Sequence, residues 1–322
     1  MFDKEQPLVS ICCIAYNQEK FIRECLDSFL MQKTNFSFEI VISDDCSTDN
    51  TKKIINSYII KFPNIFVDVS PSENLGMIKN YYHALSSCKG KYIAFCEGDD
   101  YWIDENKLQM QVDFLESNPE YGMCYTKAKQ YDQKNKIFFE NLSGADFINF
   151  YYLLKGGNPI PALTTVYKKE LLSNYLLEIS PIDKNWLMGD YPLWLYISRE
   201  SKVMFMDKVT SVYRILTQSA SHHTDINRMV DFRKSVYDIK EFYSKLYNVA
   251  VDFSWDETSY FIQLAFAYGK RNELLLFNKV VTNKADKIKI LLAKNIIIFN
   301  ISFFCYKVYN RFLVFFKKMR AK

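Results

Sequence analysis

Residues 8–32, "LVSICCIAYNQEKFIRECLDSFLMQ", contain the pattern that decides the fold. Residues 8–16 are almost entirely apolar, as expected for a short strand that is covered on both faces. Apolar side chains then recur at helical spacing, at Phe21, Ile22, Cys25, Leu26 and Phe29. A buried strand followed by an amphipathic helix is the repeating unit of a parallel α/β sheet.

The same alternation continues to residue 96. Strands are predicted over 38–43, 64–70 and 91–96, and helices over 48–62 and 77–88. The first half is therefore expected to form a Rossmann-like α/β fold with a doubly wound, mostly parallel sheet. Ligands of such sheets bind beyond the carboxyl ends of the strands.

Beyond about residue 120 the pattern is mixed. A hairpin-like pair is predicted over 122–132 and 136–140, and a strand leading into a helix over 161–172. A helix is predicted over 190–200, two short strands over 201–215, and helices from about 225 to the end. We expect a first domain over 1–224 and a helical C-terminal region over 225–322.

Composition excludes several classes of protein. Of 322 residues, 49% are hydrophobic, which argues against global disorder. The net charge of +4 is too small to indicate nucleic-acid binding. The eight cysteines form no CxxC pair, so reduced thiols in a cytoplasmic protein are predicted. The first ten residues lack the pattern of a signal peptide, so export by that route is not expected.

Acidic residues follow two of the predicted strands. Glu97, Asp99 and Asp100 come after strand 91–96, and Asp44 and Asp45 after strand 38–43. In one interpretation these carboxylates cap the following helices or lie in solvated turns. In the other, the first group binds a divalent cation beside a phosphate-bearing substrate, and the second accepts a hydrogen bond from the ring N–H of a nucleobase.

Four ordered stretches together resemble the family-2 glycosyltransferases of GT-A fold: residues 9–32, 39–51, 74–85 and 90–102. The resemblance is close to about residue 125 and looser to about 223. It implies an inverting enzyme that transfers a sugar from a nucleotide-sugar donor, a UDP-sugar above all. The implied acceptor is a hydroxyl of a glycan or lipid-linked glycan, as in surface polysaccharide synthesis, and the implied cofactor is Mn²⁺ or Mg²⁺.

The resemblance also assigns roles to residues. Asp99 is the implied metal ligand, with Asp100 as helper or helix cap, and Asp190 in "GDYPLW" is the implied general base. Glu97 and Gly189 depart from the pattern, because relatives carry aspartate at the first position and an acid at the second. By spacing alone, Asp190 is equally a helix N-cap. The implied donor-binding residues are Ala15 (usually proline), Tyr16, Asn17, Asp44, Asp45, Lys79, Glu97, Gly98 and Arg214.

Two of these assignments have plain structural alternatives. Lys79 is equally a solvated lysine on a helix. Relatives often carry a histidine where Leu216 stands, so His222 or His223 is expected to replace the missing metal ligand. The alternative is that both histidines belong to an ordinary surface loop.

The last 39 residues, 284–322, contain many lysines and arginines and one acid, Asp286. No apolar run reaches the roughly 20 residues that a membrane-spanning helix needs. A basic amphipathic helix lying on an anionic membrane surface is predicted, on the inner face of the plasma membrane. The alternative is a helix packed on the protein's own core or on a partner subunit, and the sequence does not give the oligomeric state.

Two other functions compete with glycosyl transfer. A nucleotidyltransferase would need a glycine-rich, basic phosphate loop near the N-terminus, and "AYNQEKF" at 15–21 offers none. A non-catalytic module that binds a nucleotide sugar or a protein partner stays open, because Glu97, Gly189 and Leu216 all depart from the pattern.

Overall fold

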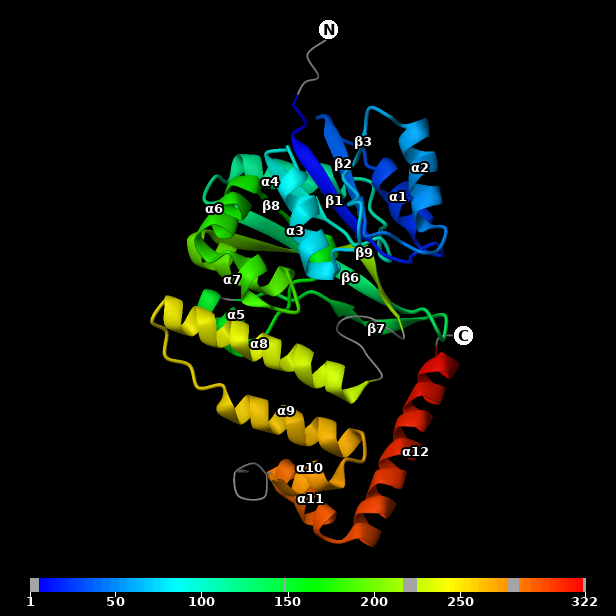
Figure 1. Ribbon diagram of the computed structural model, residues 1–322, viewed down its shortest axis with the longest axis vertical. Helices are drawn as coiled ribbons and strands as arrows, with labels where there is room; N and C mark the ends of the chain where they lie inside the picture. The colour runs from blue at the N-terminus through cyan, green and yellow to red at the C-terminus, as the bar shows by residue number, and fades with distance from the viewer. Residues whose placement is uncertain (1–5, 148, 217–224, 277–283, 321–322) are drawn as a thin grey trace. The chain divides into compact units, whose positions relative to one another are not determined.

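The computed structural model describes residues 6–147, 149–216, 225–276 and 284–320 (Figure 1). Contacts within the chain divide it into two compact units, Met1–Ile215 and Leu216–Lys322. The division follows the last strand of the sheet and precedes residue 225, where the sequence pattern had placed the start of the helical region. We describe each unit by itself.

The described residues of the first unit form one nine-stranded sheet in the order β3-β2-β1-β4-β8-β6-β9-β5, with β7 paired to β6. The strands are β1 (Val9–Ala15), β2 (Phe38–Asp44), β3 (Phe66–Asp68), β4 (Tyr92–Phe95), β5 (Tyr101–Trp102), β6 (Tyr121–Asp132), β7 (Ile137–Ser143), β8 (Val166–Lys168) and β9 (Lys202–Ile215).

The N-terminal half of the sheet is parallel, as predicted. β1 pairs in parallel with β2 and β4, and β2 with β3. Beyond β4 the sheet is mixed, because β8 runs antiparallel to both β4 and β6, while β9 runs parallel to β6. β1 and the last six residues of β2 are buried throughout, which explains their nearly continuous apolar sequences.

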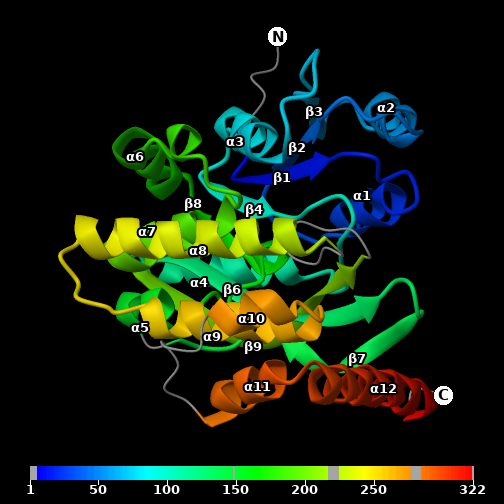
Figure 2. The same cartoon turned by 60° about the horizontal axis from the view of Figure 1, so that its bottom comes forward.

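Helices cover both faces of this sheet, with α3 on one side of β1 and β4 and α4 on the other (Figure 2). The helices are α1 (Ile22–Leu30), α2 (Thr51–Lys61), α3 (Met77–Ser87), α4 (Lys107–Ser117), α5 (Phe150–Gly156), α6 (Lys169–Ile179) and α7 (Asp190–Glu200). Two 3₁₀ turns, Ala162–Thr164 and Pro181–Lys184, complete the unit. The eight cysteines are free thiols, as expected.

The prediction of two short strands over 201–215 is wrong. The structure has one strand, β9, which pairs with β6 along almost its whole length. In the sequence the polar pair Asp207 and Lys208 resembles a turn. In the structure the register between β6 and β9 shifts at Lys127, and the two strands remain paired on both sides of that shift. Lys127 also forms an ion pair with Asp207, which keeps the polar residue within the strand.

The described part of the second unit is helical, as predicted, with α8 (Ile226–Leu246), α9 (Ser254–Ala267), α10 (Arg271–Leu276), α11 (Lys284–Lys294) and α12 (Ile296–Arg320). Ile262, Phe266, Leu274, Ile290 and Phe299 form its small core. Across the described residues of the whole chain, no helix combines the length and the hydropathy that crossing a membrane requires.

Candidate functional site

The carboxyl ends of β1, β2 and β4 meet at one edge of the sheet. Ala15, the last residue of β1, lies opposite Asp44, the last residue of β2. On the other side of β1, the main-chain N–H of Gly98 donates a hydrogen bond to the carbonyl of Ile14 (3.0 Å). The strand order reverses between β1 and β4, and such a reversal opens a ligand-binding crevice in doubly wound sheets.

Three carboxylates gather just after β4. Glu97, Asp99 and Asp100 each offer an oxygen within 4.8 Å of the others. Burial raises the pKa of all three, and in Glu97 burial, with the charges of Asp99 and Asp190, raises the pKa to about 8. Crowded carboxylate oxygens in a poorly solvated site are the donor set that Mg²⁺ and Mn²⁺ prefer. The described residues therefore fit a divalent cation.

Arg214, near the end of β9, holds this acidic turn in place. Its guanidinium donates to the main-chain carbonyl of Asp99 and to the carboxylate of Glu24, and it lies over the ring of Tyr101 (4.3 Å from carbon to ring centre). Its main-chain N–H donates to Asp100 Oδ1 (2.7 Å). The contact to Asp100 replaces the expected helix-capping role of that residue. That Arg214 also binds phosphate stays a prediction.

Gly98 packs closely against side chains on the other side of the turn. A Cβ built on Gly98 would lie 2.4 Å from Gln18 Oε1 and 2.8 Å from Ile22 Cδ1. A larger residue here would therefore require the ends of these two side chains to move. The role of Gly98 in donor binding stays a prediction.

Asp190 is the first residue of α7 and is half-buried. Burial raises its pKa, while the main-chain N–H groups of Asp190 and Tyr191 and the side chain of Asn158 lower it. The charge of Asp190 in turn contributes to the raised pKa of Glu97. The N-cap position of α7 is occupied by Gly189, so the alternative interpretation of Asp190 as the helix N-cap is wrong. Trp194, one turn later, is fully buried and belongs to the core.

The two aspartates that follow β2 each fix a loop. Asp44 accepts hydrogen bonds from the main-chain N–H (3.1 Å) and hydroxyl of Ser47. Asp45 accepts from the main-chain N–H groups of Leu75 (2.7 Å) and Gly76 (2.9 Å), which precede α3. Both side chains are buried. The structure thus gives both residues the loop-stabilising role, and recognition of a nucleobase stays a prediction.

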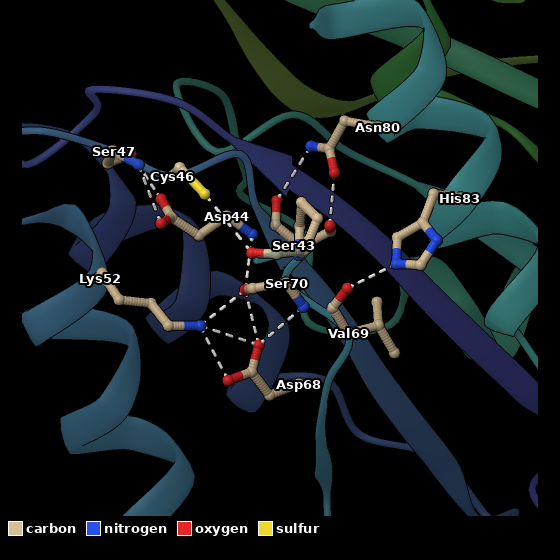
Figure 3. Close-up of polar contacts among 11 residues, drawn as sticks. Ser43, Asp44, Cys46, Ser47, Lys52, Asp68, Val69, Ser70, Asn80 and His83 are labelled. Atoms are coloured by element: carbon tan, nitrogen blue, oxygen red, sulfur yellow. Dashed lines mark hydrogen bonds and ion pairs between the residues drawn. The ribbon is translucent and has the colours of Figure 1, made fainter. Parts of the chain in front are cut away.

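A second tier of polar residues supports this loop (Figure 3). Ser70 Oγ accepts from the main-chain N–H of Asp44 (2.9 Å) and from Lys52 Nζ (2.7 Å), and Lys52 is also paired with Asp68. Asn80 Oδ1 accepts from the hydroxyl of Ser43 (2.5 Å). Sequence reasoning missed these residues, because no local pattern distinguishes them from ordinary polar residues near a strand end.

His83 links α3 to the segment after β3. Its Nε2 lies 2.7 Å from the carbonyl oxygen of Val69, just past β3 (Figure 3).

The segment after β1 presents an aromatic ring beside these loops. Tyr16 is 48% exposed. Asn17 adopts a left-handed backbone conformation (φ 53°), and its Oδ1 accepts from the main-chain N–H of Thr48 (2.8 Å), joining the loops after β1 and β2. Lys79 is exposed on α3. His222 and His223 lie outside the described residues.

Comparisons with known proteins agree with this architecture. The model of "Glycosyl transferase family 2" matches residues 10–175, about half of the chain. The uncharacterized protein Rv1520 of Mycobacterium tuberculosis is 45% identical over 117 residues, which are 36% of this chain and 34% of that protein. The chain thus spans only about a third of that relative's length.

A longer match is the UDP-Glc:alpha-D-GlcNAc-diphosphoundecaprenol beta-1,3-glucosyltransferase WfaP of Escherichia coli. It is 33% identical over 215 residues, or 66% of this chain and 80% of WfaP. Among solved structures, S. aureus TarS in complex with UDP has a TM-score of 0.54 at 18% identity, covering 88% of this chain and 78% of that one. This structural likeness supports the fold alone, whereas the family model and the match to WfaP identify the family. The chain belongs to glycosyl transferase family 2 and has the GT-A fold.

Proposed function

We propose that the chain is a metal-dependent, inverting glycosyltransferase that uses a UDP-sugar donor and a hydroxyl of a glycan or lipid-linked glycan acceptor. The observation that carries the proposal is the cluster of Glu97, Asp99 and Asp100 after β4, whose carboxylate oxygens lie within 4.8 Å of one another. Such a cluster suits a divalent cation that binds the diphosphate of a nucleotide sugar. The similarity to WfaP, whose name includes UDP-Glc and a diphosphoundecaprenol-linked sugar, supports the donor and acceptor classes.

The proposed reaction is a single displacement. The acceptor oxygen attacks the anomeric carbon from the face opposite the nucleoside diphosphate, and the bond from that carbon to the diphosphate oxygen breaks. Asp190 takes the proton of the acceptor hydroxyl as that new bond forms. Partial burial favours this role, because it raises the pKa of Asp190 and makes the carboxylate a better base.

Asp99, with Glu97 and Asp100, would hold the cation. When bound, a Mg²⁺ or Mn²⁺ ion supplies positive charge that stabilises the departing diphosphate. Arg214 and Gly98 would keep the three carboxylates converging. Tyr16 would stack on the nucleobase, and the loops fixed by Asn17, Asp44 and Asp45 would shape its pocket.

We propose further that α11 and α12 bind an anionic membrane surface. On α12, Phe299 is buried against Phe266, while Ile297, Ile301 and Phe304 are 59–67% exposed. These three lie at i, i+4 and i+7, and therefore on one face of the helix.

The charges of this segment favour the same partner. Its acid, Asp286, is 1% exposed and paired with Lys289. The other described lysines of the segment, Lys284, Lys287, Lys294 and Lys307, are exposed. An apolar face bordered by positive charge matches anionic lipid headgroups.

The test of the catalytic proposal is nucleotide release by the full chain from a panel of UDP-, GDP- and dTDP-sugars, with MnCl₂ and a lipid-linked glycan acceptor. Release that depends on both the acceptor and the metal is expected, with a UDP-sugar preferred. Tight donor binding without release from any member would contradict the proposal and favour a non-catalytic binding module.

A further inference from the structure

We propose that Asn158 is a positioning residue for the general base: its side-chain amide fixes the carboxylate of Asp190 in the orientation that receives the acceptor proton. The inference rests on the proposed function, because it assumes that Asp190 is the base. Asn158 Nδ2 donates a hydrogen bond to Asp190 Oδ2 (3.2 Å). No sequence pattern pointed to Asn158.

The orientation of the amide follows from its second contact. Asn158 Oδ1 accepts a hydrogen bond from the main-chain N–H of Ile160 (3.0 Å). Because the oxygen end of the amide is occupied by a donor, the NH₂ end is the one that faces Asp190. The reversed amide would lose both contacts, since it would direct NH₂ at an N–H group and oxygen at a carboxylate.

The backbone around Asn158 is anchored to the same helix that carries Asp190. Asn158 follows α5 and Gly157, whose φ of 124° turns the chain sharply after the helix. Tyr191, the neighbour of Asp190, donates its hydroxyl hydrogen to the carbonyl of Leu153 in α5 (3.0 Å). Leu153, Ile160 and Tyr191 are all buried. The segments that carry Asn158 and Asp190 therefore pack against each other, with the side chain of Asn158 at the surface.

This arrangement supplies what a carboxylate base lacks by itself. The terminal torsion of aspartate is broad, so a carboxylate held at one end only can rotate. The main-chain N–H groups of Asp190 and Tyr191 lower the pKa of the Asp190 carboxyl from its own helix, and Asn158 contacts the carboxylate from a separate segment. Contacts from two directions fix the plane of the carboxylate, and small errors in such geometry can cost up to about 100-fold in rate.

The test uses two substitutions that change different parts of the amide. Asn158→Asp keeps the shape and the acceptor for Ile160 N–H but replaces the donor by a second carboxylate oxygen. Asn158→Ala removes both contacts. Asn149→Ala is the matched control, because Asn149 caps α5 through the main-chain N–H of Tyr152 (3.0 Å) and perturbs the same segment without touching Asp190.

The first measurement needs no substrate. Urea unfolding of the full chain is measured for wild type, Asn158→Ala, Asp190→Ala and the double variant, because an asparagine at position 190 could still accept the hydrogen bond. Effects that are clearly non-additive are expected, since the two side chains interact directly. Additive effects would show that the contact carries no energy and would overturn the inference.

The second measurement is turnover with the UDP-sugar that the wild type uses fastest. We expect kcat to fall at least about tenfold in Asn158→Asp and Asn158→Ala, with KM for the donor unchanged, and to stay near wild type in Asn149→Ala. In the Asp190→Asn background, Asn158→Ala should cause no further loss.

The outcomes separate the two proposals. If Asp190→Asn is inactive but Asn158→Asp turns over normally, only the positioning role is refuted. If Asp190→Asn itself is fully active, the proposed base is wrong, and the positioning role falls with it.

Discussion

Gly189 lies directly against the ring of Tyr81. A Cβ built on Gly189 would stand 2.5 Å from Tyr81 Cδ1 and 2.6 Å from Cε1. Tyr81 is buried and packs edge-on against Phe95 (5.0 Å between ring centres). The ring thus occupies the space beside the start of α7 and leaves no room for an acidic side chain at position 189.

This contact predicts that substitutions at Gly189 and Tyr81 have coupled effects on stability. Gly189→Ala is expected to destabilise the first unit by about 1–3 kcal/mol, because the added methyl overpacks a ring that cannot move freely. Tyr81→Leu should remove most of that penalty, so the double variant should be less destabilised than the sum of the two. The measurement is urea unfolding of all four proteins. A fully additive result would show that the chain relaxes at Gly189 without cost.

The metal assignment is tested by Asp99→Asn, which keeps size but removes a charged oxygen ligand. We expect the affinity for Mn²⁺, measured by calorimetry, to fall more than about tenfold. Loss of a residue that only hydrogen-bonds a metal ligand already costs about that much, and Asp99 is proposed to bind the ion directly. EDTA should abolish nucleotide release by the wild type, and MnCl₂ should restore it. Asp113→Asn, an exposed substitution on α4, is the control. Full turnover in EDTA would refute the metal role.

Lys107 predicts a pH-dependent stability. This lysine is fully buried in α4, where its Nζ donates to Gln111 Oε1 (2.8 Å) and lies over the ring of Trp102 (4.2 Å). Burial lowers the pKa of Lys107 to about 7. The unfolded chain keeps this proton up to about pH 10.4. Between about pH 7 and 10 the unfolded state therefore binds more protons, and the lysine makes stability rise with pH.

Lys107→Met removes that rise. The free energy of unfolding of the variant minus that of the wild type should become more negative from pH 7 to pH 9, by up to about 1.4 kcal/mol per pH unit. The lost hydrogen bond to Gln111 shifts the difference equally at both values and leaves the slope intact. Lys53→Met, at an exposed position of α2, should give a difference independent of pH. A flat difference for Lys107→Met would mean that the lysine stays protonated in the fold.

The strand–helix alternation was predictable because each element carries its own periodic signal. The helix predicted over 190–200 coincides with α7. Its run of apolar residues could be recognised in the sequence. The acidic turn was predictable for a similar reason, since three carboxylates after a buried strand form a local pattern.

The partners of these residues were not predictable. Glu24 and Arg214 meet across 190 positions of sequence, and Asn158 reaches Asp190 across 32. Such contacts depend on how distant elements pack, and single polar residues carry no periodic signal. The same limit explains β9, where the polar pair Asp207 and Lys208 suggested a break that pairing with β6 overrides.

The tail predicts membrane binding that depends on charge. Removal of residues 284–322 should release the protein from vesicles of phosphatidylglycerol and phosphatidylcholine, and high salt should weaken binding of the full chain. Ile301→Asn with Phe304→Asn is a milder variant that changes only the exposed face of α12. The measurement is co-sedimentation. Equal binding by full-length and shortened chains would refute the proposal that α11 and α12 bind the membrane. Aggregation of the shortened chain alone would favour a helix that packs on protein.

Asp190 gives the sharpest test of the enzyme as a whole. Asp190→Asn keeps the shape of the side chain but cannot accept the acceptor's proton. A positioned base contributes about 10²- to 10⁴-fold to rate, which corresponds to roughly 3 to 5 kcal/mol in the barrier. Transfer should therefore fall by at least about a hundredfold. Donor affinity by calorimetry should hardly change, because the predicted nucleotide contacts lie in the loops after β1, β2 and β4.

Asp183→Asn is the matched control, since Asp183 is an exposed acid in the 3₁₀ turn before α7. It should transfer at the wild-type rate. Undiminished transfer by Asp190→Asn would show that Asp190 is not the general base.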